Sequence, residues 1–124
     1  MLLAIAGAMG TLGRHAVNVS ASRYLGAHFP FGTLAVNCFG CLLAGFLAQF
    51  AIGAGTLSPG AKLAIMVGFL GAFTTFSSMS YETVALFEAG SWRSAGTNIA
   101  ANLVLGLGAT MAGLAAARGI FGRG

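Results

Sequence analysis

Long apolar runs separated by short polar stretches dominate the chain and predict membrane-spanning helices. We expect four spans, at about residues 2–22, 33–52, 60–88 and 94–117. Each is at least as long as the roughly 20 residues that an α-helix needs to cross the hydrocarbon core of a bilayer. The connections between them hold residues typical of turns and membrane interfaces, such as Pro30, Pro59 and Trp92. The pattern predicts an all-α membrane protein that forms one domain over residues 1–124.

Polar residues interrupt the third apolar run at positions where lipid-facing side chains are expected. Residues 68–83 read GFLGAFTTFSSMSYET, so hydroxyl side chains closely follow Gly68 and Gly71. Hydroxyl groups compete for backbone hydrogen bonds, and a broken helix leaves backbone groups without partners. Such breaks persist in membranes only where they are buried in protein or line an ion path. We therefore predict a helix break near residues 71–78 and a functional site at that break.

Amide side chains form a second polar feature. Asn37 lies about one turn inside the second span, and Asn98 and Asn102 lie four residues apart in the fourth. A spacing of four places side chains on one helical face, which continues through Gly106 and Thr110. Amides in lipid either join helices by hydrogen bonds or line a cavity, and the residues alone leave both interpretations open.

Composition excludes several classes of protein. The chain has 124 residues, of which 57% are hydrophobic and 6% charged, and its mean hydropathy is +0.89, unlike a soluble domain. Its 20 glycines indicate closely packed helices, and Gly7, Gly10 and Gly13 form one such stripe. The net charge of +4 comes without a basic cluster, so we expect no nucleic-acid partner.

The reactive residue types do not form a pattern typical of catalysis. His15 and His28 lie apart in sequence, and we find no paired carboxylates and no nucleophile with a base, so we predict that the protein is not an enzyme. Cys38 and Cys41 form a C-x-x-C inside an apolar helix. Without a basic environment, this pair is better interpreted as small packing residues than as a redox or zinc site.

Two starts of spans have recognisable signals. Thr33 is the expected N-cap of the second span. Residues 53–60 have the composition of a turn, and within it Ser58 and Pro59 can cap and begin the third span.

The basic residues are almost evenly divided between the two sides of a four-span arrangement. One side carries Lys62, Arg118 and Arg123; the other carries Arg23 and Arg93; Arg14 is ambiguous. Positive charge normally sets orientation, and this chain has almost no bias. We therefore expect dual topology and an antiparallel homodimer in which every functional residue occurs twice.

Four segments resemble a family of small fluoride channels, known as Fluc or CrcB. They are GAMGTLGR of residues 7–14, PFGTLAVNCFGCLLAG of residues 30–45, the break sequence of residues 68–83, and the polar fourth span. The resemblance implies a fluoride-selective channel in the cell (inner or plasma) membrane that lowers cytoplasmic fluoride. It also implies an antiparallel dimer with a sodium ion at its centre and two fluoride pathways beside it.

The resemblance also implies roles for individual residues. The backbone carbonyls of Gly71 and Thr74 would bind sodium. The acid after the break, Glu82, is a possible gating or ion-relay residue. The fluoride pathway would comprise Asn37, Phe76, Ser77, Ser78, Met79, Asn98, Asn102 and Thr110. Met79 departs from the family pattern because it stands where a second phenylalanine is expected.

The chemistry of the residues agrees with this implication. Fluoride is small and strongly hydrated, so a path must replace its water with many donors, which amides and hydroxyls supply. One alternative is a small proton-coupled multidrug transporter, but that activity needs a membrane-embedded carboxylate, and the first span has none. The other alternative is a non-transporting assembly subunit, in which the amides would only join helices.

Overall fold

The computed structural model describes residues 1–53 and 57–122, and the part of the chain it covers is helical. The helices are α1 (Leu2–Leu25), α2 (Phe31–Gly53), α3 (Pro59–Leu63), the π-helical segment η1 (Ala64–Leu70), α4 (Gly71–Phe73), α5 (Phe76–Glu88) and α6 (Trp92–Phe121). The predicted turn at residues 53–60 includes residues 54–56, which lie outside the described residues.

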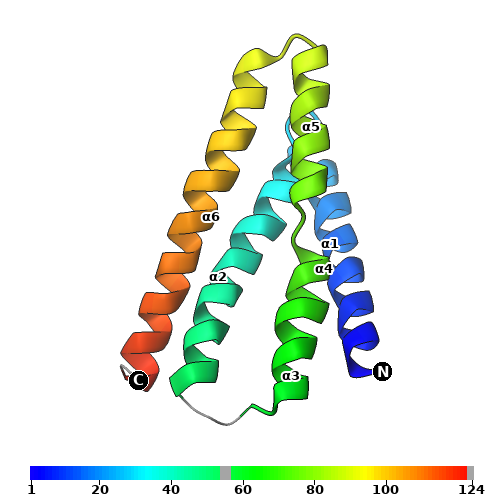
Figure 1. The fold of residues 1–124 in the computed structure, drawn as a ribbon. Coiled ribbons are helices and arrows are strands. Elements are labelled where there is room, and N and C mark those ends of the chain that lie inside the picture. The colour runs from blue at the N-terminus through cyan, green and yellow to red at the C-terminus, as the bar shows by residue number, and fades with distance from the viewer. Residues whose placement is uncertain (54–56, 123–124) are drawn as a thin grey trace.

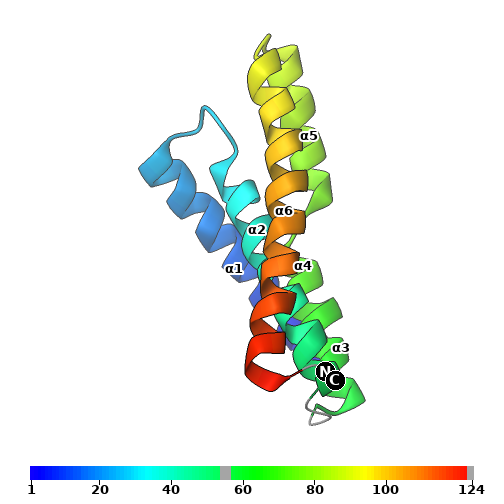
Figure 2. The same ribbon diagram turned by 90° about the vertical axis from the view of Figure 1, so that its left-hand side faces the viewer.

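The long helical stretches run in alternating directions, so that α6 ends near the end of the molecule at which α1 begins (Figure 1). Segments α3, η1, α4 and α5 follow one another as a single interrupted rod. The hairpin of α5 and α6 extends beyond the connection between α1 and α2, and α1 is tilted away from this hairpin (Figure 2). The interruption in the rod therefore lies in the middle of the bundle, beside α2.

Among the described residues, three stretches are long and apolar enough to cross a membrane: Phe31–Phe50, Pro59–Glu88 and Trp92–Phe121. The protein is thus a multi-pass membrane protein. The first predicted span is a helix of 24 residues, α1, but it is not among these three stretches. Arg14, His15 and Arg23 lower its apolar character.

The predicted start of the second span is wrong by two residues. Helix α2 begins at Phe31, directly after Pro30, whose carbonyl accepts the Leu34 amide at 3.1 Å. Thr33 therefore lies in the first turn instead of at the N-cap, and its hydroxyl is free to bond another helix. The start of the third stretch is as predicted: the Ser58 side chain accepts from the Ala61 amide at 3.3 Å, and Pro59 is the first helical residue.

Glycines set the closest helix contacts. Helices α2 and α6 pack most extensively, and their backbones meet at Gly45 and Gly113. A β-carbon at Gly113 would collide with the Leu42 carbonyl, and one at Gly45 would collide with the Thr110 carbonyl. The predicted stripe on α1 is confirmed in the same way, because Gly10 lies against the Phe69 carbonyl. Small residues thus bring backbones into direct contact, as in other membrane bundles.

Candidate functional site

The third apolar stretch breaks at Thr74 and Thr75, inside the predicted range of residues 71–78. Both residues are extended, with φ and ψ of −83° and 158° at Thr74 and −155° and 115° at Thr75. Helix α5 then begins at Phe76, since the Thr75 hydroxyl accepts from the Ser78 amide at 3.1 Å and acts as its N-cap. The hydroxyl-rich sequence therefore ends one helix and caps the next.

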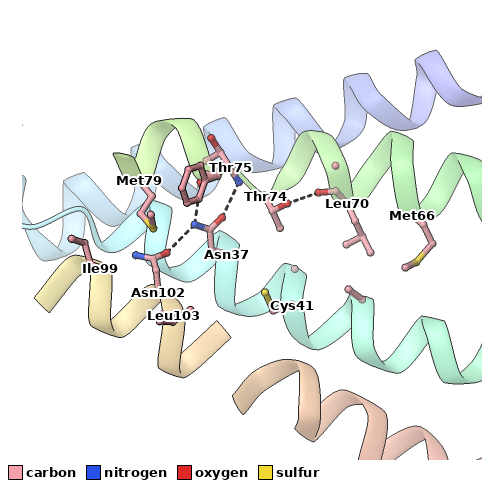
Figure 3. A pocket seen from close by; sticks show the side chains of 14 residues that line it. Asn37, Cys41, Met66, Leu70, Thr74, Thr75, Met79, Ile99, Asn102 and Leu103 are labelled. Carbon is pink, nitrogen blue, oxygen red and sulfur yellow. Dashed lines mark hydrogen bonds between the residues drawn. The ribbon is translucent and has the colours of Figure 1, made fainter. Parts of the chain in front are cut away.

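Asn37 of α2 binds the backbone of the break with both ends of its amide (Figure 3). Its Oδ1 accepts from the Thr75 N–H at 2.8 Å, and its Nδ2 donates to the Thr75 carbonyl at 3.1 Å. A side-chain amide thus replaces the backbone partners that Thr75 would have in a continuous helix. Because unpaired backbone groups cost several kcal/mol in hydrocarbon, Asn37 stabilises the break.

A chain of hydrogen bonds continues from Asn37 into α6. Asn37 Nδ2 also donates to Asn102 Oδ1 at 2.8 Å, and Asn102 Nδ2 donates to Asn98 Oδ1 at 3.0 Å. Asn98 is fully buried and donates to Thr83 Oγ1 of α5 at 3.0 Å. Thr83 in turn donates to the Met79 carbonyl at 2.7 Å. We call Asn37, Asn102, Asn98 and Thr83 the amide relay; it joins α2, α6 and α5 around the break.

The amide hydrogens of the relay all point to protein oxygens. Besides the bonds above, Asn102 Nδ2 donates to the Asn98 carbonyl at 2.9 Å, and Asn98 Nδ2 donates to the Met79 carbonyl at 3.4 Å. Each Nδ2 therefore has two acceptors, which is its full capacity. An anion that enters must replace one of these internal acceptors.

A cavity of about 530 Å³ opens beside the break, and Figure 3 shows its lining. It brings together six of the predicted residues: Asn37, Gly71, Thr74, Phe76, Met79 and Asn102. Phe76 is 78% exposed, so this residue lies at the surface of the chain. Ser77 and Ser78 lie next to this cavity without lining it, and their hydroxyls are 3.2 and 3.0 Å from Thr75 Oγ1.

The break removes the helical donors of several carbonyls, including those of Gly71 and Thr74. In a continuous α-helix the amide four residues later would bond each carbonyl. For Gly71 that amide is Thr75 N–H, which donates to Asn37. For Thr74 it is Ser78 N–H, which donates to the Thr75 hydroxyl. The two carbonyls that the family resemblance implies as sodium ligands are thus among those whose usual donors are directed elsewhere.

Asn98 belongs to the amide relay but does not line this cavity, and two further predicted residues lie away from it. Thr110 is on the predicted face of α6, but its hydroxyl donates to the Gly106 carbonyl at 3.1 Å and does not line the cavity. Glu82 lines a separate, smaller cavity with Asn18, and its Oε1 accepts from Thr33 Oγ1 at 2.6 Å.

The sequence pattern did not predict a site role for four residues that the structure places here: Thr75, Thr83, Thr33 and Asn18. The rule that selected Asn37, an amide inside an apolar helix, also selects Asn18. Thr83 follows Met79 by four residues, which allows its hydroxyl to bond that carbonyl. The pairing of Thr33 with Glu82 spans 49 residues and has no local signal.

An apolar helical bundle with a break held open by amide side chains defines a multi-pass membrane protein with a polar interior. The family model described as "CrcB-like protein, Camphor Resistance (CrcB)" matches residues 1–114. The chain therefore belongs to the CrcB family.

Relatives with curated names resemble almost the whole chain. A protein of Dehalococcoides mccartyi (strain CBDB1) is 46% identical over 107 residues, which cover 86% of this chain and 82% of the relative. A protein of Rhizobium etli is 41% identical over 120 residues, covering 97% and 96%. A protein of Geobacter sulfurreducens is 41% identical over 118 residues, covering 95% of each. Each of these relatives is named "Fluoride-specific ion channel FluC".

Proposed function

We propose that this protein is a fluoride-selective channel that lets fluoride leave the cell passively through the inner or plasma membrane. The observation that carries the proposal is the broken third stretch whose backbone is bound by Asn37. Family membership and the names of the relatives support it. A break in a membrane helix is retained where it serves ion passage or is buried, and this one borders a cavity.

The proposed path follows the cavity and the amide relay. Asn37 and Asn102 supply N–H donors, and the edge of the Phe76 ring adds a weakly positive surface. Fluoride would take the place of an internal acceptor, such as Asn102 Oδ1, which now receives the Asn37 amide. Exchange of one acceptor for another lets the ion bind without a full positive charge that would trap it. Ser77, Ser78, Met79, Asn98 and Thr110 would complete the path.

A structural sodium ion fits the carbonyls of Gly71 and Thr74. Carbonyl oxygens suit hard cations, and these two have lost their helical donors. When bound, the ion would satisfy both carbonyls and raise the local potential for an anion. The residues of this chain hold the break in place through Asn37 and the Thr75 cap.

Efflux from liposomes is the direct test. Purified protein in vesicles loaded with fluoride should release it, with little release from vesicles loaded with chloride. Proton-driven export of a cationic dye would instead support the multidrug-transporter alternative. A well-folded preparation that moves neither solute would support the assembly subunit.

We further propose four spans per chain, with α1 as the first, and an antiparallel homodimer. The alternating directions of the helices support an even number of crossings (Figure 1). The near balance of basic residues supports insertion in both orientations.

Orientation provides a separate prediction. A tag at one terminus should be accessible from both sides of native membranes in comparable amounts, because the charge bias is nearly zero. Adding three arginines to the 89–91 connection should make the chain one-sided and inactive when expressed alone. Strictly one-sided labelling of the unmodified protein would contradict the antiparallel dimer.

Met79 provides a prediction about selectivity. Met79 lines the cavity, and its thioether fills volume without the positive ring edge of phenylalanine. We expect Met79→Phe to leave fluoride efflux within about twofold of the parent, and Met79→Ala to increase chloride efflux, because it widens the path. Efflux of the two ions, measured side by side, checks this. A severalfold gain in fluoride efflux for Met79→Phe would show that an aromatic ion ligand is missing here.

A further inference from the structure

A small polar cavity of about 160 Å³ lies apart from the break, between α1, the start of α2 and α5. Its polar lining comes from Asn18 and Ser22 of α1, Thr33 of α2 and Glu82 of α5. The larger cavity at the break shares none of these residues. The proposed fluoride path therefore leaves this second cavity without a role.

Glu82, which lines this cavity, has one buried and unpartnered oxygen. Its Oε1 is held by the Thr33 hydroxyl at 2.6 Å, whereas its Oε2 is buried and has no hydrogen-bond partner among the described residues. The described lining contains no lysine, arginine or histidine that would neutralise the carboxylate. A buried carboxylate without a counter-charge is costly.

Asn18, which also lines the cavity, has a second unpartnered oxygen. Its Oδ1 is also buried and has no partner in the described part of the chain. Gly32 permits this approach, because a β-carbon at Gly32 would collide with Asn18 Oδ1. Gly32 directly precedes Thr33, which holds Glu82. Two residues that line the same small cavity thus each carry a buried acceptor oxygen without a partner, and one of these oxygens is on a carboxylate.

We propose that this cavity binds a monovalent, sodium-sized cation between Glu82 Oε2 and Asn18 Oδ1. Carboxylate and amide oxygens are the ligands that hard cations prefer. One negative charge matches one positive charge, whereas a divalent ion would leave an uncompensated charge in the bundle. The Ser22 hydroxyl offers a further oxygen. This site is distinct from the Gly71 and Thr74 carbonyls, and it does not depend on fluoride conduction.

Thermal unfolding of the purified protein tests the proposal. Replacing choline by sodium at about 150 mM total salt should raise the melting temperature by about 3–6 °C. The part of this rise in melting temperature that comes from sodium in the cavity should be mostly lost in Glu82→Gln and in Asn18→Leu. Both variants leave the Gly71 and Thr74 carbonyls unchanged, so the difference from the parent reports the cavity alone.

A control and a gain of function complete the test. Ser80→Ala changes a residue of the same helix that does not line the cavity, and it should keep the full sodium response. Asn18→Asp supplies a second carboxylate, so millimolar calcium should stabilise this variant more than the parent.

Two results would overturn the site. One is a sodium response in Glu82→Gln equal to that of the parent, together with no calcium gain in Asn18→Asp. The other is a parent protein whose stability responds to pH but not to the cation. That result would mean that Glu82 Oε2 is protonated or accepts a hydrogen bond from the Asn18 amide.

Discussion

Asn37→Leu is expected to abolish fluoride efflux and to destabilise the fold. The change leaves Thr75 N–H and C=O without the partners that Asn37 supplies, and it removes the donor to Asn102. Each buried group left unpaired costs about 1–3 kcal/mol, so we expect a loss of about 2–4 kcal/mol in the free energy of unfolding. Efflux should fall at least about tenfold, because the change removes a donor from the proposed path. Liposome efflux and denaturation in detergent measure the two effects.

Asn102→Leu is the matched control for this prediction. It interrupts the amide relay but leaves both bonds between Asn37 and Thr75 in place. Efflux should fall in this variant as well, with a smaller loss of stability. If Asn37→Leu and Asn102→Leu both released fluoride as fast as the parent, the amides would serve only to join helices.

The second large effect is expected at the contact between α2 and α6. Gly113→Ala places a methyl group against the Leu42 carbonyl and the Phe46 amide, both of which are backbone groups that cannot move aside alone. The helices must separate, and overpacking of this kind costs about 1–3 kcal/mol or more. The relay should also loosen, since Asn37 and Asn102 sit on the separated helices. The measurements are the melting temperature and the fluoride efflux.

Gly108→Ala, on the same helix, is the control variant for Gly113→Ala. A β-carbon at Gly108 would meet no atom within 4 Å. Replacing a helical glycine by alanine at an open position is neutral or stabilising by roughly 0.5–1 kcal/mol. If both alanine variants behaved alike, the close approach of the two backbones would not control stability.

The sequence predicted the helical class, the break and the polar face of α6 because each depends on local chemistry. Hydroxyl residues near Thr75 both disturb a helix and cap one, and the four-residue spacing of Asn98 and Asn102 places them on one face. The confirmed glycine stripe on α1 also follows from spacing alone.

The partners of these groups could not be predicted in the same way. The partner of Asn37 lies 38 residues away at Thr75, and that of Thr33 lies 49 residues away at Glu82. Such pairings depend on how helices are placed side by side, which periodicity does not report. The prediction of Thr33 as an N-cap was wrong because α2 already begins at Phe31, directly after Pro30, and this frees the hydroxyl for the distant carboxylate.

The bond between Asn37 and Thr75 has a consequence for biogenesis. The break in the third stretch cannot enter hydrocarbon alone, because Thr75 would carry unpaired backbone groups into lipid. Asn37 precedes Thr75 by 38 residues and therefore leaves the ribosome first. Helix α2 can thus already be in the membrane when the third stretch enters, so that Asn37 can bond the Thr75 backbone at once. The order of the residues along the chain is then also the order of assembly in the bilayer.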